Sequence, residues 1–205
     1  ASTSQIDQIR LHGGRESIPR LQGTLEEARS IEAVVKQVGG HSVVLTGRDA
    51  TVTNLFAAVD GQRFVHLATH GYVGTRARPY DASLALAEPD TITVDDIGFL
   101  RLSDLIDGWR NKLDRCELVV LSACDSQRGV VSGGNVMSLT WGFMYAGAPA
   151  VIASVWPVAD ITTAELMGDF YENHLAGDAS NKLAAFVQAK RQQRRLRGHP
   201  FYWAP

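Results

Sequence analysis

The sequence predicts an α/β fold in which a mostly parallel sheet is covered by helices on both faces. Three apolar runs of strand length, at residues 63–68, 117–122 and 149–155, lie between segments with helical periodicity. The runs read as nearly continuous in apolar residues, which is typical of strands buried on both faces of a sheet. In open sheets of this kind, ligands bind beyond the carboxyl ends of the strands. We therefore expect the functional residues to follow these strands.

The length and composition favour one compact domain. The chain has 205 residues, of which 45% are hydrophobic, enough for a sizeable core. Its net charge of −2 gives no electrostatic signature of nucleic-acid binding, and the basic run at 190–197 reads as a solvated helix end. The sequence contains no apolar stretch of membrane-spanning length and no signal peptide. We expect a cytoplasmic domain that binds neither nucleic acid nor membrane.

The first predicted element is a helix that begins near Thr24. Residues 1–23 are polar and lack periodicity, so we expect a linker or N-terminal extension there and one domain over 24–205. Thr24 and Glu27 have the spacing of a capping box. Apolar residues then recur on one face until the glycine pair at 39–40 ends the helix.

A short strand and a second helix follow. The strand is expected at 42–46, and Thr51 or Asp49 then caps the helix. Residues 71–95 contain Gly, Pro and Asp, and they read as a loop that carries a small hairpin or edge strand at 83–87. Loops of this kind at strand ends usually carry the ligand contacts.

The second half of the chain alternates helices and strands, which is the arrangement that parallel strand pairs require. The predicted elements are one or two amphipathic helices at 95–115, a strand at 117–122, a helix from 136 that ends at Gly147, a strand at 149–155, a helix from Asp160 or Thr162, and a last helix from Ser180 or Asn181 to about Arg195.

Two of the predicted strands end in residues that could perform acyl transfer. The first runs into His70 and Gly71, and the second runs into Cys124 and Asp125. A thiolate favoured by a neighbouring imidazole can form a thioester, and the imidazole can deliver a proton to the departing amine. Gly71 lets the backbone approach a substrate carbonyl, so its N–H and that of Cys124 are candidates for an oxyanion hole.

Each of these residue types also has a purely structural interpretation. A free cysteine is often a small buried hydrophobe; we expect this of Cys116, and for Cys124 a buried structural role and a nucleophilic role both stay open on these residues alone. His66 lies four residues before His70 in the same predicted strand, and we expect a buried, hydrogen-bonded structural histidine there. Two cysteines and scattered histidines support neither a disulfide framework nor a zinc site, so no metal or cofactor is expected.

Six stretches, spread over residues 20–204, carry a resemblance to a known family. In chain order they are LQGTLEEARSIEAV, HLATHGYV, LVVLSACDSQRG, GGNVMSLTWGFMYAGAPAVIASVWPVAD, TAELMGDFY and HPFYWA. Together they resemble the CHAT domain, a caspase-like and separase-like peptidase module of clan CD. The most diagnostic parts are SAC-D-S and SVWPVAD.

The resemblance implies a caspase-like, three-layer α/β/α sandwich and a cysteine endopeptidase that cleaves a protein substrate. His70 and Cys124 fall on the family's catalytic dyad, and Gly71 and Cys124 fall on its oxyanion donors. In separases, the acidic residue that ends the Trp-x-Val-x-Asp motif lines the pocket for a basic P1 side chain, and it matches Asp160 here. Asp125 is a second candidate for that substrate contact. Asp160 could instead cap the following helix, and Asp125 could brace its loop.

The resemblance also implies a partner. CHAT modules commonly sit beside TPR repeats or other sensor domains, so activity is expected to be switched from outside this chain, through loops such as 71–82 or 125–134. The segment 99–115 is longer than the family's usual link, which affects the expected pocket rim. Two rivals stay open. One is a caspase-like interaction module without turnover; the other is a nucleotide or small-molecule binder, which lacks a phosphate-binding fingerprint.

Overall fold

The structure, a computed structural model, describes most of the chain from residue 21 onward. The described ranges are 21–74, 77–123, 129–132, 135–156, 160–178 and 181–204. The predicted linker at 1–23 therefore lies almost wholly outside them. The predicted first helix is the first element inside them.

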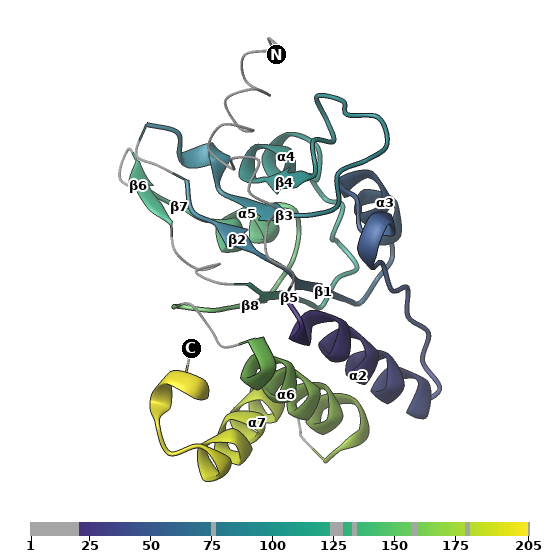
Figure 1. The fold of residues 1–205 in the computed structure, drawn as a ribbon, viewed down its shortest axis with the longest axis vertical. Coiled ribbons are helices and arrows are strands. Elements are labelled where there is room, and N and C mark those ends of the chain that lie inside the picture. Colours follow the sequence, from purple (N-terminus) through teal and green to yellow (C-terminus); the bar gives the residue numbers. More distant parts are fainter. Residues whose placement is uncertain are drawn as a thin grey trace.

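A parallel three-stranded sheet forms the centre of the fold (Figure 1). Its strands are β1 (Phe64–Ala68), β5 (Leu118–Ser122) and β8 (Val151–Ala153), in the order β1-β5-β8. The pairs β1 with β5 and β5 with β8 are both parallel. Each strand falls within one of the three predicted apolar runs, so the prediction of an α/β fold with a parallel sheet is confirmed.

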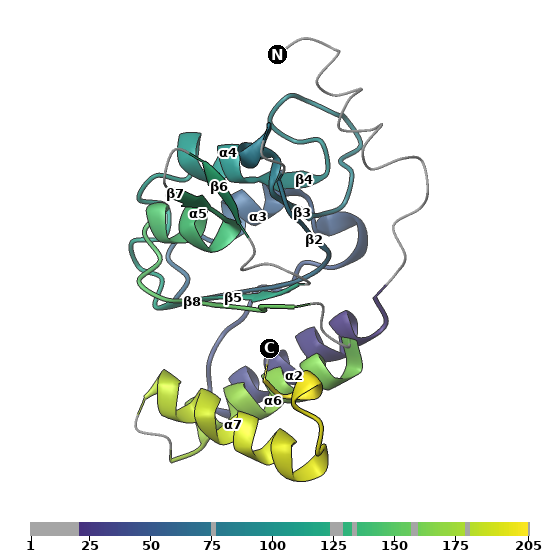
Figure 2. The same ribbon diagram turned by 90° about the vertical axis from the view of Figure 1, so that its left-hand side faces the viewer.

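Helices lie on both faces of this sheet (Figure 2). One face carries α2 (Gly23–Gln37), α6 (Asp160–Tyr171) and α7 (Lys182–Leu196). The opposite face carries α3 (Val52–Ala58), α4 (Leu102–Asp107) and α5 (Leu139–Tyr145). Each set of helices shares an apolar cluster with the strands, so the sheet lies between two cores.

Two further small sheets lie on the α3, α4 and α5 side. One is antiparallel, in the order β2 (Gly71–Tyr72), β3 (Ser83–Ala85) and β4 (Phe99–Arg101). The other is the hairpin of β6 (Val130–Ser132) with β7 (Asn135–Met137). Short turns are η1 (Gly47–Asp49), η2 (Pro79–Asp81), the π-helical η3 (Glu172–Ala176) and η4 (Pro200–Tyr202). Because this side mixes helices with strands, the finer expectation of a three-layer α/β/α sandwich stays a prediction.

The strand predicted at 42–46 is wrong. No described residue pairs with this segment, and its valines, Val43 and Val44, are exposed to solvent. A strand needs a neighbour to satisfy its backbone N–H and C=O groups, and a short apolar run does not supply one. The next prediction is confirmed, because the Thr51 hydroxyl caps α3 by accepting a hydrogen bond of 3.1 Å from the backbone N–H of Asn54.

The capping box predicted for Thr24 and Glu27 is also wrong. Helix α2 begins at Gly23, and the Thr24 hydroxyl donates to the carbonyl of Leu21 at 3.0 Å. The Glu27 side chain turns into the protein, where only 1% of the residue is exposed. Its spacing from Thr24 fits a cap, but its place on the apolar face of the helix decides its contacts.

The region 83–115 differs from the sequence prediction in two ways. Strand β3 is buried along its whole length and pairs antiparallel with both β2 and β4. Its pairing with the preceding β2 confirms the predicted small hairpin, whereas the alternative of an edge strand is wrong. The stretch expected to form amphipathic helices at 95–115 contains β4 followed by the short helix α4. Leu102 and Leu105 of α4 are fully buried, and the helix ends at Asp107 with Gly108 as its C-cap.

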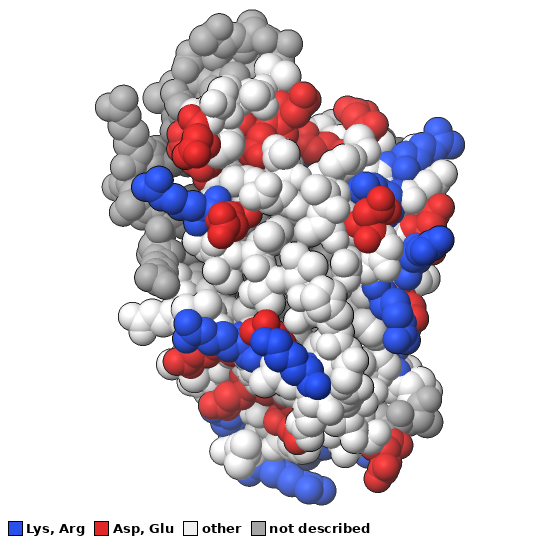
Figure 3. Space-filling view, turned by 90° about the vertical axis from the view of Figure 1, so that its right-hand side faces the viewer, with Lys and Arg blue, Asp and Glu red and all other residues white. Residues whose placement is uncertain are grey.

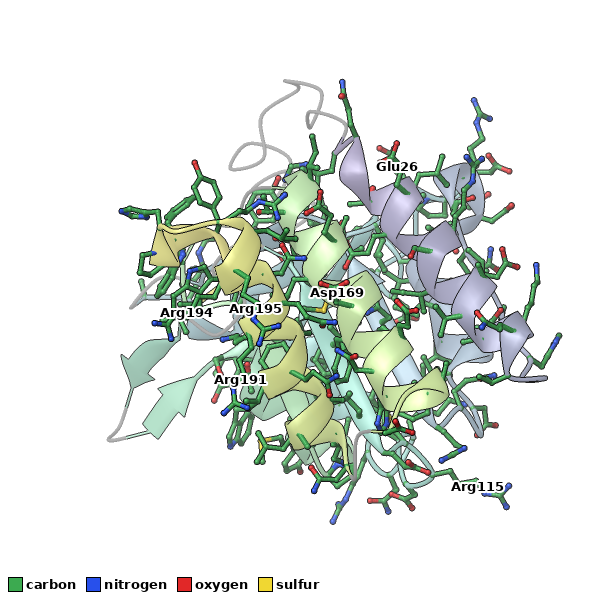
Figure 4. The ribbon with its side chains drawn as sticks, turned by 90° about the horizontal axis from the view of Figure 1, so that it is seen from below. Glu26, Arg115, Asp169, Arg191, Arg194 and Arg195 are labelled. Carbon is green, nitrogen blue, oxygen red and sulfur yellow. The ribbon has the colours of Figure 1, made fainter. Side chains whose placement is uncertain are left out.

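Charged side chains of both signs are interspersed on the face that Figure 3 shows. The basic run in α7 is exposed as predicted for a solvated helix end: Arg191, Arg194 and Arg195 come from this helix and lie at one side of the helical face (Figure 4). The guanidinium of Arg194 lies 5.6 Å from the ring centroid of Trp203, and Arg197 pairs with Glu165. Neighbouring contacts of this kind explain part of the run without any nucleic acid.

Candidate active site

Strands β1 and β5 end side by side at one edge of the central sheet. Their register is parallel and places Ala68 opposite Ser122. Beyond the last strand residue, the backbone N–H of Thr69 still donates to the carbonyl of Ser122 at 3.2 Å. The prediction that both strands end at the same edge is therefore confirmed.

His70 lies just after β1, where the chain leaves the central sheet. The carbonyl of His70 accepts a hydrogen bond of 2.9 Å from the N–H of Ala85. The hydroxyl of Thr69 donates a hydrogen bond to the carbonyl of Ala85. Gly71 then begins β2 and pairs with Leu84. The backbone of the predicted base and of one predicted oxyanion donor is thus held by β3, and both residues are partly buried.

His66 and His70 do not share one continuous strand, contrary to the sequence prediction. Strand β1 ends at Ala68, and His70 leads into a strand of another sheet. The alternation of side chains with period two therefore stops between them.

Three predicted site residues fall wholly or partly outside the described part of the chain. Cys124 and Asp125 lie outside it, and of Asp160 only the backbone is described, as the first residue of α6. The description ends at Ala123, which is 2% exposed and whose carbonyl accepts a hydrogen bond of 2.5 Å from the Ser154 hydroxyl. The backbone leading to Cys124 is therefore fixed, while the separation of its sulfur from the His70 ring stays a prediction.

Sequence reasoning missed a buried polar network beneath this edge. The imidazole of His66 lies 2.9 Å from Glu27 through Nε2 and 3.3 Å from the Tyr171 hydroxyl through Nδ1. The second carboxylate oxygen of Glu27 accepts a hydrogen bond of 3.1 Å from the Ser122 hydroxyl. The expected structural, hydrogen-bonded role of His66 is confirmed. The sequence does contain a signal for the partner of His66, because Glu27 is a glutamate on the apolar face of the first helix.

Cys116 is the buried small residue that the sequence predicts. Its thiol donates to the carbonyl of Leu118 at 3.3 Å, and burial raises its pKa. A raised pKa keeps the thiol protonated and therefore unreactive at neutral pH.

Two cavities lie on the α2, α6 and α7 side of the sheet. The larger is an open groove of about 610 Å³ between these helices, lined by residues that include Ser30, Asp169 and Gln193, and His70 is not among its lining residues. The smaller, of about 20 Å³, lies where β5 and β8 end and is lined by Ser122 and Ser154 among others. The larger groove is therefore separate from the strand ends, where the sequence predicts the functional residues.

Two kinds of feature are absent from the part of the chain that the structure describes. It holds no group of three or more His, Cys, Asp or Glu side chains arranged to bind a metal ion. None of its helices combines the length and the apolar character needed to cross a membrane.

Comparison with known proteins gives one family and two relatives. The sequence profile of the CHAT domain matches residues 7–205. Tetratricopeptide repeat protein 28 of Mus musculus is 26% identical over 188 residues, which cover 78% of this chain and 8% of that protein. Tetratricopeptide repeat protein 28 of Homo sapiens is 30% identical over 88 residues, or 43% of this chain and 4% of that protein. The chain therefore spans less than a tenth of the length of these curated relatives.

Proposed function

The chain belongs to the CHAT domain family, which is related to the caspase-like cysteine peptidases, and from this membership we propose that it is a cysteine endopeptidase domain acting on a protein substrate. Cys124 is the nucleophile and His70 is the general base and acid. The backbone N–H groups of Gly71 and Cys124 form the oxyanion hole. A caspase-like α/β/α sandwich is part of the same proposal.

The observation that supports this function best is the shared edge of β1 and β5. Ala68 lies opposite Ser122, and Thr69 is hydrogen-bonded to Ser122, so the segments that carry His70 and Cys124 leave the sheet next to each other. In a parallel α/β sheet this edge is where ligands bind. The chemistry needs a base within hydrogen-bond reach of the thiol, and neighbouring strand ends favour that geometry.

The proposed reaction proceeds through an acyl-enzyme. His70 accepts the thiol proton as the sulfur of Cys124 attacks the scissile carbonyl, and the oxyanion receives hydrogen bonds from the two backbone N–H groups. His70 then donates its proton to the departing amine, leaving a thioester. Water, deprotonated by His70, attacks the thioester and releases the acid product and the free thiol. The residues named supply every proton transfer of this scheme.

Asp160 and Asp125 are the two proposed contacts for a basic P1 side chain, because a carboxylate binds Arg or Lys through charge-assisted hydrogen bonds. Helix α6 begins at Asp160, seven residues after the last residue of β8, whose neighbour in the sheet is β5. Asp160 also has a structural alternative, because a carboxylate in the first turn of a helix is stabilised by the helix dipole.

The partners are proposed from the relatives. The curated relatives are named for tetratricopeptide repeats, and the chain matches only a small share of each. We place a repeat or other sensor domain beside this one in the full-length protein, in the cytoplasm, where it switches the peptidase on. No nucleic acid, membrane, metal or organic cofactor takes part in the proposal.

The test is cleavage of a peptide library by the full-length protein. Cys124→Ala and His70→Ala should each lower kcat by at least about a thousandfold, because each removes one half of the dyad. Cys116→Ala is the matched control, since it removes the buried cysteine and leaves the dyad. Equal cleavage by wild type and Cys124→Ala would exclude the mechanism, and no cleavage by any form under any activating condition would favour an interaction module without turnover.

A second experiment assigns the P1 pocket. Cleavage after Arg or Lys that disappears in Asp160→Ala but persists in Asp125→Ala identifies Asp160 as the contact, and the reverse identifies Asp125. Loss in both variants indicates a shared pocket. Unchanged basic cleavage in both removes these two residues from substrate recognition.

A further inference from the structure

Glu27 is a buried carboxylate for which the proposed reaction has no use. It lies in α2 on the side that faces the sheet, and only 1% of the residue is exposed. A charged group buried this deeply is costly unless its oxygens are hydrogen-bonded. Its partners therefore indicate what it contributes.

The two oxygens of Glu27 bind two different strands. Oε1 lies 2.9 Å from Nε2 of His66 in β1, and Oε2 accepts a hydrogen bond of 3.1 Å from the hydroxyl of Ser122 in β5. Ser122 is the last residue of β5 and lies opposite Ala68, the last residue of β1. One side chain of α2 thus joins both strands close to the edge where they end.

The donors and acceptors of this network are mutually consistent. Burial and the nearby charge of Glu27 raise the pKa of Tyr171, so its hydroxyl keeps its proton and can donate to Nδ1 of the His66 ring. The other ring nitrogen, Nε2, can then donate to Glu27. The carboxylate receives one hydrogen bond on each oxygen, which makes the contact directional as well as close.

Within the described residues, the backbone joins the two strand ends directly through one hydrogen bond beyond their paired residues. This bond runs from the N–H of Thr69 to the carbonyl of Ser122, and its 3.2 Å is at the long end of the usual range. Strand ends open more readily than strand centres. A side-chain clamp at this position adds what the backbone lacks.

We propose that Glu27 is a positioning residue for the candidate dyad, holding the ends of β1 and β5 at the separation that brings His70 to Cys124. The inference rests on the proposed function, because those two residues follow the clamped strands. A displacement of α2 is passed to both strand ends through Glu27. Shifts of about 1 Å between reacting groups lower rates by about a hundredfold, so the clamp matters even where its loss moves the strand ends only slightly.

Three variants test the clamp. Glu27→Gln keeps the size of the side chain and removes its charge, and Ser122→Ala removes the β5 contact alone. Glu32→Gln is the matched control, because Glu32 lies in the same helix and its ion pair within the described chain is with Lys36, at 2.7 Å and partly exposed. Circular dichroism and thermal unfolding first establish which variants are folded at the temperature of measurement. If Glu27→Gln is not folded, Ser122→Ala still tests the clamp.

The first measurement is independent of catalysis. Hydrogen exchange of the Thr69 amide, followed by NMR in the full-length protein, should become at least about tenfold faster in Glu27→Gln and in Ser122→Ala. Glu32→Gln should stay within about twofold of wild type. Unchanged exchange in both clamp variants would overturn the proposal.

The second measurement reads the dyad itself. The pH dependence of Cys124 alkylation by iodoacetamide should have its midpoint below the ordinary thiol value of about 8.5 in wild type. The midpoint should rise toward that value in Glu27→Gln and Ser122→Ala, with kcat reduced at least about tenfold and KM unchanged. Glu32→Gln should match wild type, and a merely destabilised but folded protein would show no such change in pH profile.

The outcomes separate the two proposals. A low wild-type midpoint that Glu27→Gln and Ser122→Ala leave unchanged would overturn the positioning role while leaving the peptidase intact. An ordinary wild-type midpoint together with absent cleavage would overturn the dyad and, with it, the positioning of a dyad by Glu27; the exchange of Thr69 would then report a structural clamp alone.

Discussion

The two faces of strands β1 and β5 are built on different principles. On the α3, α4 and α5 face, Val65, Leu67, Val119 and Leu121 are aliphatic and belong to one apolar cluster. On the α2, α6 and α7 face, His66 and Ser122 interrupt the apolar residues and are tied to Glu27. Apolar packing is strong but does not fix direction, whereas hydrogen bonds to a buried carboxylate do. Both faces therefore bury apolar residues, and the second adds a directional polar network to its apolar cluster.

The largest expected effect comes from the apolar face. Phe143 is fully buried and packs edge-on against Trp109, with 6.1 Å between the ring centroids. Phe143→Ala removes this contact and leaves a cavity, so the free energy of unfolding should fall by about 3–5 kcal/mol. Chemical denaturation monitored by circular dichroism measures it. A loss below about 1 kcal/mol would mean that this face is not the main source of stability.

The second effect concerns the carboxylate of the other face. Glu27→Ala leaves the ring N–H of His66 and the hydroxyl of Ser122 without their acceptor in a buried place. The free energy of unfolding should fall by about 2–4 kcal/mol, mostly through the cost of these unpaired groups. Denaturation of the double variant with Ser122→Ala checks the cause, because the two changes should be less than additive.

A smaller effect is expected at the far end of the network. Tyr171→Phe keeps the ring in its apolar cluster and removes only the hydroxyl that lies 3.3 Å from His66. The free energy of unfolding should fall by about 1 kcal/mol. Thermal unfolding measures it, with Phe170→Leu as a control that changes packing but no hydrogen bond. An effect as large as that of Glu27→Ala would place the centre of the network at Tyr171 instead.

The smallest effect lies at the surface. Arg63 and Glu117 form an ion pair whose side chains are 68% and 45% exposed, and the hydrogen bond from Arg63 lowers the pKa of the Glu117 carboxyl. Glu117→Gln should change the free energy of unfolding at neutral pH by less than about 0.5 kcal/mol. Because the pKa of Glu117 is lowered in the folded state, this small stabilisation is present at neutral pH and disappears as the pH falls through that folded-state pKa. Urea unfolding at pH 7 and at pH 3 would reveal the convergence of variant and wild type; a persistent difference at low pH would point to another cause.

Local patterns predicted what depends on neighbours along the chain. The three buried strands, the Thr51 cap and the start of the last helix after Asn181 all follow from residues close in sequence. The strand expected at 42–46 failed because pairing depends on a distant neighbour. The capping box expected at Glu27 was wrong for the same reason. The spacing between Thr24 and Glu27 fits both a capping box and a buried glutamate, and only the distant partners of Glu27, His66 and Ser122, distinguish the two.

Part of the candidate site also follows from local patterns, and part depends on residues that are distant in the sequence. The shared edge of the strands that lead to His70 and Cys124 follows from parallel topology, which periodicity predicts. The sequence could not predict that β1 ends at Ala68 and that β3 then holds the backbone of His70, because Ala85 is remote in the chain. Residue roles at Cys124, Asp125 and the Asp160 side chain stay predictions.

The sequence separation of the clamp has a consequence for biosynthesis. The Glu27–Ser122 contact joins residues 95 positions apart, and the His66–Tyr171 contact joins residues 105 apart. Contacts of such long range form late in folding, since the chain must close large loops before they can act. On the ribosome, the full network cannot close until synthesis has passed Tyr171, after His70 and Cys124 have been added to the chain. A nascent chain that ends before Tyr171 therefore lacks one member of the network, and the strand ends gain their full set of side-chain contacts only when most of the domain has been made.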